Sequence, residues 1–434
     1  MHRPGHSLSA RLRWSLGWAL WAAMLFLATF ACLPASAAKP AGGGLRPATT
    51  PTGAAPGKAS PGFPVDLSLG PRQATFTFDL PQAGCVSLLA NQPGKRETAR
   101  LWGPAWLEPG HHAIGLEAGR VASRTGFVEC FSIDLIPRQS VGRSGNGERQ
   151  FIRPMGLGWD PSHKELYVAD TGNDRIVRLG ADGRFIGQYG GFGLALGDPS
   201  EEREDSLSGP WDVAPGGFSN FYVADQNNDR ICEFDAYKSY KGDFFPKPND
   251  TRSRLNRPRG LCIDFESNLW VVDSRADRIL KLAPSGAKLF ELGGYGWSKW
   301  NFRDPTQVAV DPEGRIYVCD PGNHRIGVFD RLGSVLLEIK DHLKAPVGVG
   351  VDPDGLIAIC DEETNELGLY TPDGRRVLMC NGMSDRDRFR TPCDVAITPR
   401  TLYLLDSGNH RVVLLERRKS HLESPWQAGP RVLE

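Results

Sequence analysis

A short phrase that returns through the second half of the chain constrains its fold more than any other feature. The phrase Tyr-Val-Ala-Asp-Thr-Gly-Asn-Asp-Arg-Ile begins at Tyr167, and close copies begin at Tyr317 and Tyr403. A unit of this kind forms one small sheet that cannot bury both of its faces alone, so successive units must stack. The apolar run of the phrase ends in aspartate at six places 41 to 55 residues apart: Asp170, Asp225, Asp273, Asp320, Asp361 and Asp406. The period and the number of copies predict a β-propeller with six blades.

Each copy opens with a proline, and a short apolar strand follows it. These prolines are Pro154, Pro210, Pro258, Pro305, Pro346 and Pro392. Three positions before each proline stands a large apolar residue, which the fixed spacing predicts to pack between blades: Phe151, Leu207, Leu255, Phe302, Leu343 and Phe389. The last copy supplies three clear strands, and a strand-like segment precedes the first copy. We therefore predict a closed ring in which the segment around 133–141 completes the sixth blade, since closure removes exposed sheet edges.

The amino-acid sequence of the copies resembles the NHL repeat, which has the pattern Pro-x-Gly-φ-Ala-φ-Asp followed by Tyr-Val-Ala-Asp-x-Gly-Asn-His-Arg-Ile. The resemblance extends over residues 138–420, with five close copies and one degenerate copy in which Glu366 stands where the others have arginine. It implies an NHL-type six-bladed propeller. The expected fold class is all-β, with the propeller preceded by a small β-sandwich-like domain.

The residues before the repeats divide into three further parts. Residues 1–37 combine three arginines, an apolar run and an Ala-Ser-Ala motif, which indicates a signal peptide or an uncleaved N-terminal anchor. Residues 38–64 are rich in Pro, Gly and Ala and predict a disordered linker. Residues 65–137 alternate apolar and polar side chains, and their order resembles the immunoglobulin-like domain of flagellar hook-cap proteins. Residues 421–434 form a C-terminal tail. We therefore expect an extracytoplasmic protein, periplasmic or secreted.

The recurring phrase itself predicts structure rather than chemistry. An aspartate is followed five residues later by arginine at Asp170/Arg175, Asp225/Arg230, Asp273/Arg278, Asp320/Arg325 and Asp406/Arg411. Such a pair, across a tight turn, forms charge-assisted hydrogen bonds that brace the blade. His324 and His410 occupy positions that aspartate fills in other copies, so the same pattern favours a structural role for both over metal binding.

Candidate binding residues are found at positions that the repeat pattern does not explain. The loop 293–305 carries Trp297 and Trp300, which could stack on sugar rings, contact a protein partner or be buried against a neighbouring loop. Trp211 follows one of the blade-opening prolines. The prolines are surrounded by arginines that predict either a cationic collar for an anionic group or ordinary solvated charge: Arg153, Arg257, Arg259, Arg303 and Arg390.

A metal site is predicted at only one level of the channel. The propeller type resembles that of the zinc enzyme peptidyl-amidoglycolate lyase, whose metal-binding histidines follow the blade-opening prolines, and none of the six matching positions here is histidine. One position further along, Asp212, Gln307 and Asp394 alternate with glycine, and in the lyase a matching aspartate belongs to a calcium site. We expect no cofactor, with calcium in the central channel as the alternative.

Two function classes are consistent with this sequence. The first is a binding or scaffold module that recognises a protein or a cell-envelope glycan through the loops at the channel mouth. The second is a metal-dependent hydrolase or lyase of the lactonase or amidoglycolate-lyase type that uses the channel carboxylates. Equal numbers of basic and acidic residues, 51 each, and the export signal argue against nucleic acid as a partner. Membrane contact is expected only through an uncleaved N-terminal segment, and the protein is expected to be a monomer.

The cysteines offer two candidate pairs. The chain has nine cysteines, and removal of residues 1–37 with Cys32 leaves eight. Cys85 and Cys130 fall on two strands of the small domain, and Cys380 and Cys393 bracket the loop before the sixth blade. Connectivity does not follow from spacing alone.

Overall fold

The computed structural model describes residues 66–69, 73–80, 84–91, 98–107, 110–117, 126–191, 206–217, 220–235, 237, 239–246 and 254–421. The predicted signal peptide, linker and most of the tail lie outside these ranges. Within them the regular elements are β-strands and single-turn 3₁₀ helices, so the all-β class is confirmed. No helix in the described part is long and apolar enough to cross a bilayer.

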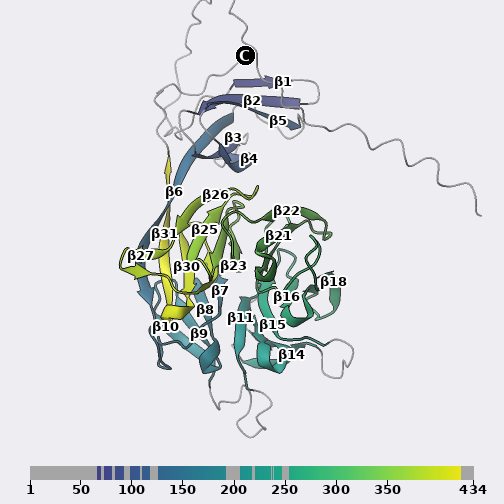
Figure 1. Ribbon diagram of the computed structural model, residues 1–434, viewed down its shortest axis with the longest axis vertical. Coiled ribbons are helices and arrows are strands. Elements are labelled where there is room, and N and C mark those ends of the chain that lie inside the picture. The colour runs from purple at the N-terminus through teal and green to yellow at the C-terminus, as the bar shows by residue number, and fades with distance from the viewer. Residues whose placement is uncertain are drawn as a thin grey trace, which may run out of the picture. The chain divides into compact units, whose positions relative to one another are not determined.

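Five four-stranded antiparallel sheets and four strands of a six-stranded sheet form the six blades (Figure 1). Blade one contains β7 (Gly156–Asp160), β8 (Glu165–Asp170), β9 (Arg175–Gly180) and β10 (Phe185–Gly190). Blade two contains β11 (Pro210–Pro215), β12 (Phe221–Asp225), β13 (Arg230–Phe234) and β14 (Tyr240–Phe245). Blade three contains β15 (Pro258–Ile263), β16 (Leu269–Asp273), β17 (Arg278–Leu282) and β18 (Lys288–Gly293). Blade four contains β19 (Val308–Val310), β20 (Ile316–Asp320), β21 (Arg325–Phe329) and β22 (Val335–Ile339). Blade five contains β23 (Pro346–Val351), β24 (Ile357–Asp361), β25 (Glu366–Tyr370) and β26 (Arg376–Cys380).

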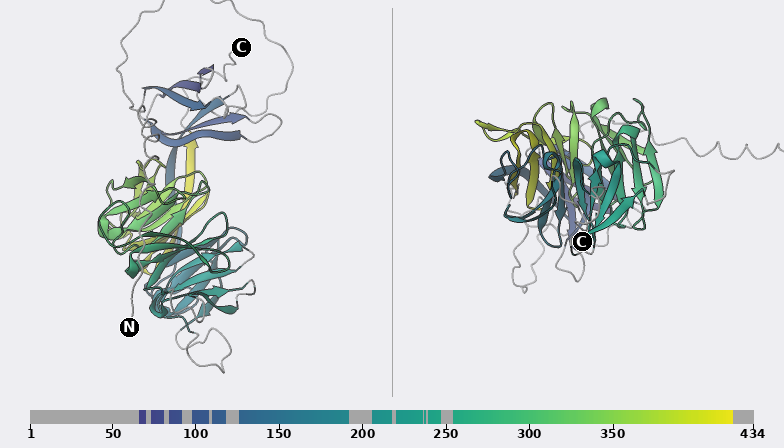
Figure 2. Two further views of the ribbon diagram at one scale, coloured as in Figure 1. Left: turned by 90° about the vertical axis from the view of Figure 1, so that its right-hand side faces the viewer. Right: turned by 90° about the horizontal axis from the view of Figure 1, so that it is seen from below.

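Blade six is assembled from both ends of the described chain. Its strands are β29 (Pro392–Ile397), β30 (Thr401–Asp406), β31 (Arg411–His421) and β6 (Gly126–Val141). β6 pairs with β31 from Val141↔Val412 to Phe131↔His421, which confirms that the segment around 133–141 completes the blade. The short strands β27 (Gly382–Ser384) and β28 (Asp387–Arg388) form a hairpin between blades five and six. The first strand of every blade contacts that of the next, including β29 with β7, so the ring is closed (Figure 2).

The strands before the propeller form two sheets. One has the order β1-β2-β5, from β1 (Asp66–Leu69), β2 (Gln73–Leu80) and β5 (Gly110–Glu117). The other joins β3 (Gly84–Asn91) and β4 (Thr98–Leu107) to the first residues of β6. Phe78 and Ile114 of the first sheet and Val86 and Leu88 of the second are buried. β6 thus runs without a break across the expected boundary at 137/138 and belongs to a small-domain sheet and to blade six.

Apolar side chains fill each junction between neighbouring blades. Six buried clusters occur in the described part, and each lies at one junction of two adjacent blades; the cluster between blades six and one also includes Val347 of blade five. The six large residues that precede the prolines are all buried in these clusters, from Phe151 between blades six and one to Phe389 between five and six. Each blade therefore hides both faces against its neighbours, as the stacking argument predicts.

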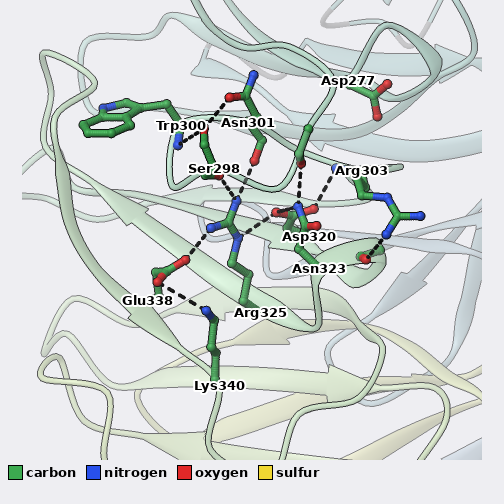
Figure 3. A network of polar contacts seen from close by, with 12 residues as sticks. Asp277, Ser298, Trp300, Asn301, Arg303, Asp320, Asn323, Arg325, Glu338 and Lys340 are labelled. Atoms are coloured by element: carbon green, nitrogen blue, oxygen red, sulfur yellow. Dashed lines mark hydrogen bonds and ion pairs between the residues drawn. The ribbon is translucent and has the colours of Figure 1, made fainter.

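The Asp–Arg pairs brace one end of the strands. In all five predicted pairs the arginine Nε donates to the aspartate Oδ2 at 2.8 Å. The second carboxylate oxygen accepts a backbone N–H from the segment that opens the same blade, as Asp320 does from Arg303 at 2.8 Å (Figure 3). In the degenerate fifth blade Asp361 accepts four backbone N–H groups instead, so no arginine is required there. The aspartate's role is to hold the turn onto the blade-opening segment.

A second residue of each turn links neighbouring blades. After the 3₁₀ turn the chain takes a left-handed conformation at Asp174, Asp229, Asp277, His324, Asn365 and His410. Asp174 accepts the backbone N–H of Gly209 in the next blade at 2.7 Å, and His410 accepts that of Arg153 at 3.3 Å. His324 instead lies against the carbonyl oxygen of Lys344 through its Nδ1. Both histidines are therefore inter-blade contacts, as the sequence pattern favoured. The 3₁₀ turns are η2 (Thr171–Asn173), η5 (Gln226–Asn228), η6 (Ser274–Ala276), η7 (Pro321–Asn323) and η8 (Ser407–Asn409).

The predicted pairing of Cys380 with Cys393 is wrong. Both thiols are free, because Cys380 ends the outer strand of blade five whereas Cys393 lies on the innermost strand of blade six. The Cys393 thiol is buried and lies 3.4 Å from the carbonyl oxygen of Pro154. The side chains of Cys85 and Cys130 lie outside what the structure describes.

Candidate functional site

The 3₁₀ turns and the segments that lead from one blade to the next share one end of the strands, which we call the turn face. On it the connection from blade three to blade four, residues 294–302, presents three exposed aromatic side chains. The exposed fractions are 64% for Tyr295, 68% for Trp297 and 56% for Trp300. The Tyr295 and Trp297 rings meet edge to face with centroids 5.7 Å apart, and the Arg303 guanidinium lies 5.1 Å from the Trp297 ring centroid. Burial against a neighbouring loop, the alternative left open by the sequence, is therefore excluded for both tryptophans.

Backbone hydrogen bonds hold this aromatic loop in shape. Arg325 is buried and donates to the carbonyl oxygens of Ser298 and Asn301 at 2.8 and 2.5 Å (Figure 3). Asn323 donates to Gly296 at 3.0 Å, and two backbone hydrogen bonds close the loop upon itself at Phe302. The recurring Asp–Arg–Asn turn of blade four therefore also fixes the loop on which the aromatic residues stand. A loop ordered before binding loses less conformational entropy when it binds.

A second loop of the chain has the same construction without the aromatic residues. Residues 143–151 lead from β6 into blade one, and Arg175 donates to Gly147 and Gln150 there, at 2.8 and 2.7 Å, as Arg325 does to Ser298 and Asn301. The bridge between residues 144 and 151 corresponds to that between 295 and 302. In this register Ser144, Asn146 and Arg149 stand where the aromatic loop has Tyr295, Trp297 and Trp300. The loop scaffold therefore does not require large aromatic side chains, and their presence needs another explanation.

The structure brings only part of the predicted cationic collar together. Arg259 stacks over Trp211 with 4.5 Å between its guanidinium carbon and the ring centroid, and Arg257 lies on the same blade-opening segment. Burial lowers the pKa of Arg259, and the neighbouring positive charges of Arg257 and Arg275 act in the same direction. Arg303 belongs to the aromatic loop instead. Arg153 and Arg390 are exposed at the openings of blades one and six, so these two do not join the group in the described structure.

The three predicted channel residues do meet. Asp212, Gln307 and Asp394 come from the first strands of blades two and six and the segment that opens blade four, and all three are buried. The Gln307 side-chain amide donates to Asp212 at 3.0 Å and to Asp394 at 3.3 Å. Each carboxylate also accepts a backbone N–H from the next blade, Leu261 for Asp212 and Leu157 for Asp394, at 2.8 and 2.7 Å. We call this group the polar belt.

Glycines in the alternate blades make room for the polar belt. A Cβ atom on Gly260 would lie 2.2 Å from Gln307 Oε1, and one on Gly156 would lie 2.4 Å from Asp212 Oδ1. The alternation of glycine with Asp or Gln noted in the sequence is therefore a packing requirement. Burial raises the pKa of Asp394 to about 6. Burial, with the nearby charge of Asp394, raises the pKa of Asp212 well above its ordinary value.

The polar belt does not offer a ready cation site in this arrangement. The position shared by the two carboxylates is filled by an N–H donor, whereas a hard cation requires oxygen ligands. Gln307 Oε1 meanwhile accepts the N–H of Val308 at 2.9 Å. Over the described residues, no group of three His, Cys, Asp or Glu side chains could hold a metal ion. The residues present therefore fit an amide bridging two carboxyl groups better than they fit calcium.

Beyond the polar belt, toward the end opposite the turn face, the channel widens into a cavity of about 570 Å³. Its walls are mainly apolar and come from the first strands, with Trp159, Ile263, Val310, Val351 and Ile397 among them. Phe265, which is 90% exposed, stands at its rim. The belt thus separates a cationic, aromatic turn face from an apolar chamber.

Sequence reasoning found the tryptophans and the polar belt but missed several residues of the turn face. Tyr295 lies in the same loop as Trp297, and its aromatic character was the available signal. Gln226, Ser274 and Arg275 lie in the turns of blades two and three, where the repeat pattern concealed them. These positions vary between copies, and that variation could have singled them out.

Comparison with known proteins identifies the repeat. The family model of the NHL repeat matches residues 302–329. "NHL repeat-containing protein 3" of Homo sapiens is 31% identical over 81 residues, which are 18% of this chain and 23% of that protein. "Protein brain tumor" of Drosophila melanogaster is 28% identical over 159 residues, which are 37% of this chain and 14% of that protein. The matches thus span less than a quarter of either relative.

Solved structures that are similar to this chain match it at low identity and with TM-scores below 0.5. Virginiamycin B lyase from Staphylococcus aureus is 11% identical, with a TM-score of 0.44, over 66% of this chain and 99% of that one. A gluconolactonase from Xanthomonas campestris is 15% identical, with a TM-score of 0.48, over 66% of this chain and 98% of that one. At these identities the likeness says nothing about a reaction or a ligand.

Proposed function

The chain is an NHL-repeat six-bladed β-propeller, and from that premise we propose that it is a non-catalytic binding module. The aromatic loop 294–302 is the surface that contacts the partner, which is a protein or a cell-envelope glycan. One observation carries this proposal. The loops 143–151 and 294–302 have the same backbone construction, but only the second has exposed aromatic side chains.

The physical argument starts from the exposure of those side chains. Tryptophan and tyrosine are the residues that contribute most to binding at protein interfaces, and tryptophan also stacks on the apolar faces of sugar rings. These exposed aromatic side chains are not needed for the stability of the isolated fold, since the matching loop of blade one has Ser144, Asn146 and Arg149 in their place. Their fixed backbone makes the loop a preformed contact surface.

The glycan alternative depends on export. The segment 1–37, on which export was predicted, lies outside the described residues. We therefore propose an extracytoplasmic location together with the glycan partner, and the protein partner does not require it.

The test exchanges the aromatic residues for those of the matching loop. The variant Trp297→Asn/Trp300→Arg uses side chains that the same scaffold already carries, so the free energy of unfolding should change by less than about 1 kcal/mol. Binding is measured separately to an envelope protein fraction and to isolated envelope polysaccharide. Loss of two interface tryptophans should weaken whichever binding occurs by about 30-fold or more.

A matched control distinguishes specific binding at this surface from nonspecific binding by exposed aromatic side chains. Phe265→Ser removes an exposed aromatic residue from the opposite end of the channel and should leave binding unchanged. If the tryptophan variant binds both fractions as the wild type does, the aromatic loop is not the contact surface.

The hydrolase or lyase alternative is less well supported, because both channel carboxylates are already saturated by amide donors. It predicts that calcium or zinc raises the melting temperature of the wild type but not of Asp212→Asn/Asp394→Asn. We expect no such difference.

A further inference from the structure

Two half-buried arginines on the segment that opens blade three, Arg257 and Arg259, and the exposed Arg275 of the following turn lack the partners that the buried arginines of this chain have. Arg175, Arg230 and Arg325 each pair with a carboxylate. In contrast, no carboxylate in the described part forms an ion pair with Arg257, Arg259 or Arg275, and Arg259 is half-buried. Asp304 and Glu362 act on Arg259 from a distance, and neither lies within ion-pair range. A guanidinium that is partly removed from water without a counter-charge is unfavourable, so this site is poised for an anion.

Other hydrogen-bond donors, on the turns of blades two and three, also lack acceptors among the described residues. The buried Nε atoms of Arg257 and Arg259, the Nε2 of Gln226 and the Oγ of Ser274 have no hydrogen-bond partner among the described residues. Gln226 and Ser274 are themselves buried. The Oε1 of Gln226 already accepts from Arg257 at 3.4 Å, so the group that remains on this side chain is its N–H₂.

Comparison with blade one shows that the free hydroxyl is not a property of the repeat. Thr171 opens the 3₁₀ turn of blade one, as Ser274 opens that of blade three, and Thr171 donates to the carbonyl oxygen of Pro210 at 2.7 Å. A buried donor left without an acceptor costs about 1–3 kcal/mol. The Thr171 contact also shows that the first residue of a turn faces the next blade, so Ser274 faces blade four. At the junction of blades two and three the donors without acceptors are those of Gln226, Arg257 and Arg259, and they indicate an acceptor from outside the chain.

We propose that the junction of blades two and three binds one oxyanion, the carboxylate or phosphate group of a ligand, through Arg259 and Gln226. Arg257 and Arg275 add positive charge, and Trp211 holds the plane of the Arg259 guanidinium by stacking upon it. A planar guanidinium fixed in this way presents its N–H groups in the geometry that carboxylate and phosphate oxygens match. The oxyanion site rests on the proposed function, because the oxyanion is a group of the partner that binds on the turn face.

The test uses the full chain with inorganic phosphate and with acetate as separate probes. Binding is measured by calorimetry and by the shift in melting temperature, with sodium chloride adjusted to constant ionic strength. At least one probe should bind the wild type, and the stronger of the two identifies phosphate or carboxylate as the group recognised. Arg259→Gln should weaken that binding by about tenfold or more, because it removes the charge-assisted hydrogen bonds.

Two further variants keep the outcome interpretable if Arg259→Gln unfolds. Gln226→Leu leaves every charge in place and should weaken binding by about threefold or more through loss of one hydrogen bond. Arg153→Gln removes an exposed arginine from the same position that Arg257 holds, one residue before a blade-opening proline, and should bind as the wild type does. Equal weakening in Arg153→Gln, unchanged affinity in both Arg259→Gln and Gln226→Leu, or no binding of either probe to the wild type would overturn the proposal.

The two proposals fail separately. Trp297→Asn/Trp300→Arg should keep the full affinity for the small anion even where it loses the partner. If that variant loses the partner but the wild type binds neither anion, the proposed function stands and only the oxyanion site is refuted.

Discussion

The Nδ1 atom of His410 accepts the backbone N–H of Arg153 at 3.3 Å, across the junction where the last blade meets the first. His324 occupies the same place between blades four and five, but its Nδ1 faces the carbonyl oxygen of Lys344. One ring therefore accepts a hydrogen bond at Nδ1 and the other donates one, so the two histidines require opposite tautomers.

The two histidines should respond differently to the same substitution. Aspartate accepts the matching N–H in blades one to three, so His410→Asp should keep the contact and change the free energy of unfolding by less than about 0.5 kcal/mol. His324→Asp would place a carboxylate against a carbonyl oxygen and should destabilise by about 1–3 kcal/mol. Urea unfolding of both variants measures the difference. Equal losses would contradict the assigned tautomers.

Replacing Arg325 should loosen the aromatic loop as well as blade four. Arg325→Lys keeps the charge but cannot reach Asp320, Ser298 and Asn301 together, so we expect a loss of about 3–5 kcal/mol. Hydrogen exchange at residues 294–302 should accelerate. Arg278→Lys is the control and should cost less, because Arg278 is more exposed and, among the described residues, donates to one carbonyl oxygen of the preceding connection, that of Arg254. Unchanged protection of 294–302 would show that the loop holds its shape without Arg325.

Adding one methyl group at Gly260 should disrupt the polar belt. A Cβ there would lie 2.6 Å from the Gln307 Cα atom, a clash that only a backbone shift relieves. Gly260→Ala should therefore cost about 1–3 kcal/mol or more. The control is Gly187→Ala, where a Cβ meets nothing within 4 Å, and it should be near neutral. A similar melting temperature for the two variants would mean that the first strands can move apart freely.

The polar belt should make stability depend on pH in a defined direction. The pKa of Asp394 rises from 3.8 to about 6 on folding, and that of Asp212 rises as well. The folded chain therefore binds more protons than the unfolded chain between about pH 4 and 6, and this contribution is lost as the pH rises through that window. For Asp394 alone the change amounts to about 3 kcal/mol. Asp394→Asn should flatten the dependence of the unfolding free energy on pH, and an unchanged slope would contradict the raised pKa.

The sequence predicted the parts of the fold that repeat. The Asp–Arg spacing, the apolar residues before the prolines and the fourth strand of blade six are all consequences of one unit copied six times, and copies can be compared by eye. The convergence of Asp212, Gln307 and Asp394 was also predictable, since equivalent positions of inner strands face one axis.

Features that depend on one particular loop were not predictable in the same way. Whether Trp297 and Trp300 are exposed depends on the path of residues 294–302, which Arg325 fixes from another strand. The direction of the Gln307 amide depends on the charges of both neighbours across the channel. The expected Cys380–Cys393 pair fails for a similar reason, since closeness along the loop does not place an outer and an innermost strand together.

The sharing of β6 between blade six and a small-domain sheet has a consequence for how the chain is made. β6 leaves the ribosome before blade one, and its partner β31 emerges only after blade five. The edge of β6 that pairs with β31 is therefore unpaired for almost the whole of synthesis. During that interval β3 can pair with residues 126–131 of β6, while residues 132–141, which later pair with β31, have no described strand partner. The small domain thus anchors one end of β6 early, and the other end stays open to wrong pairing until the last blade is made.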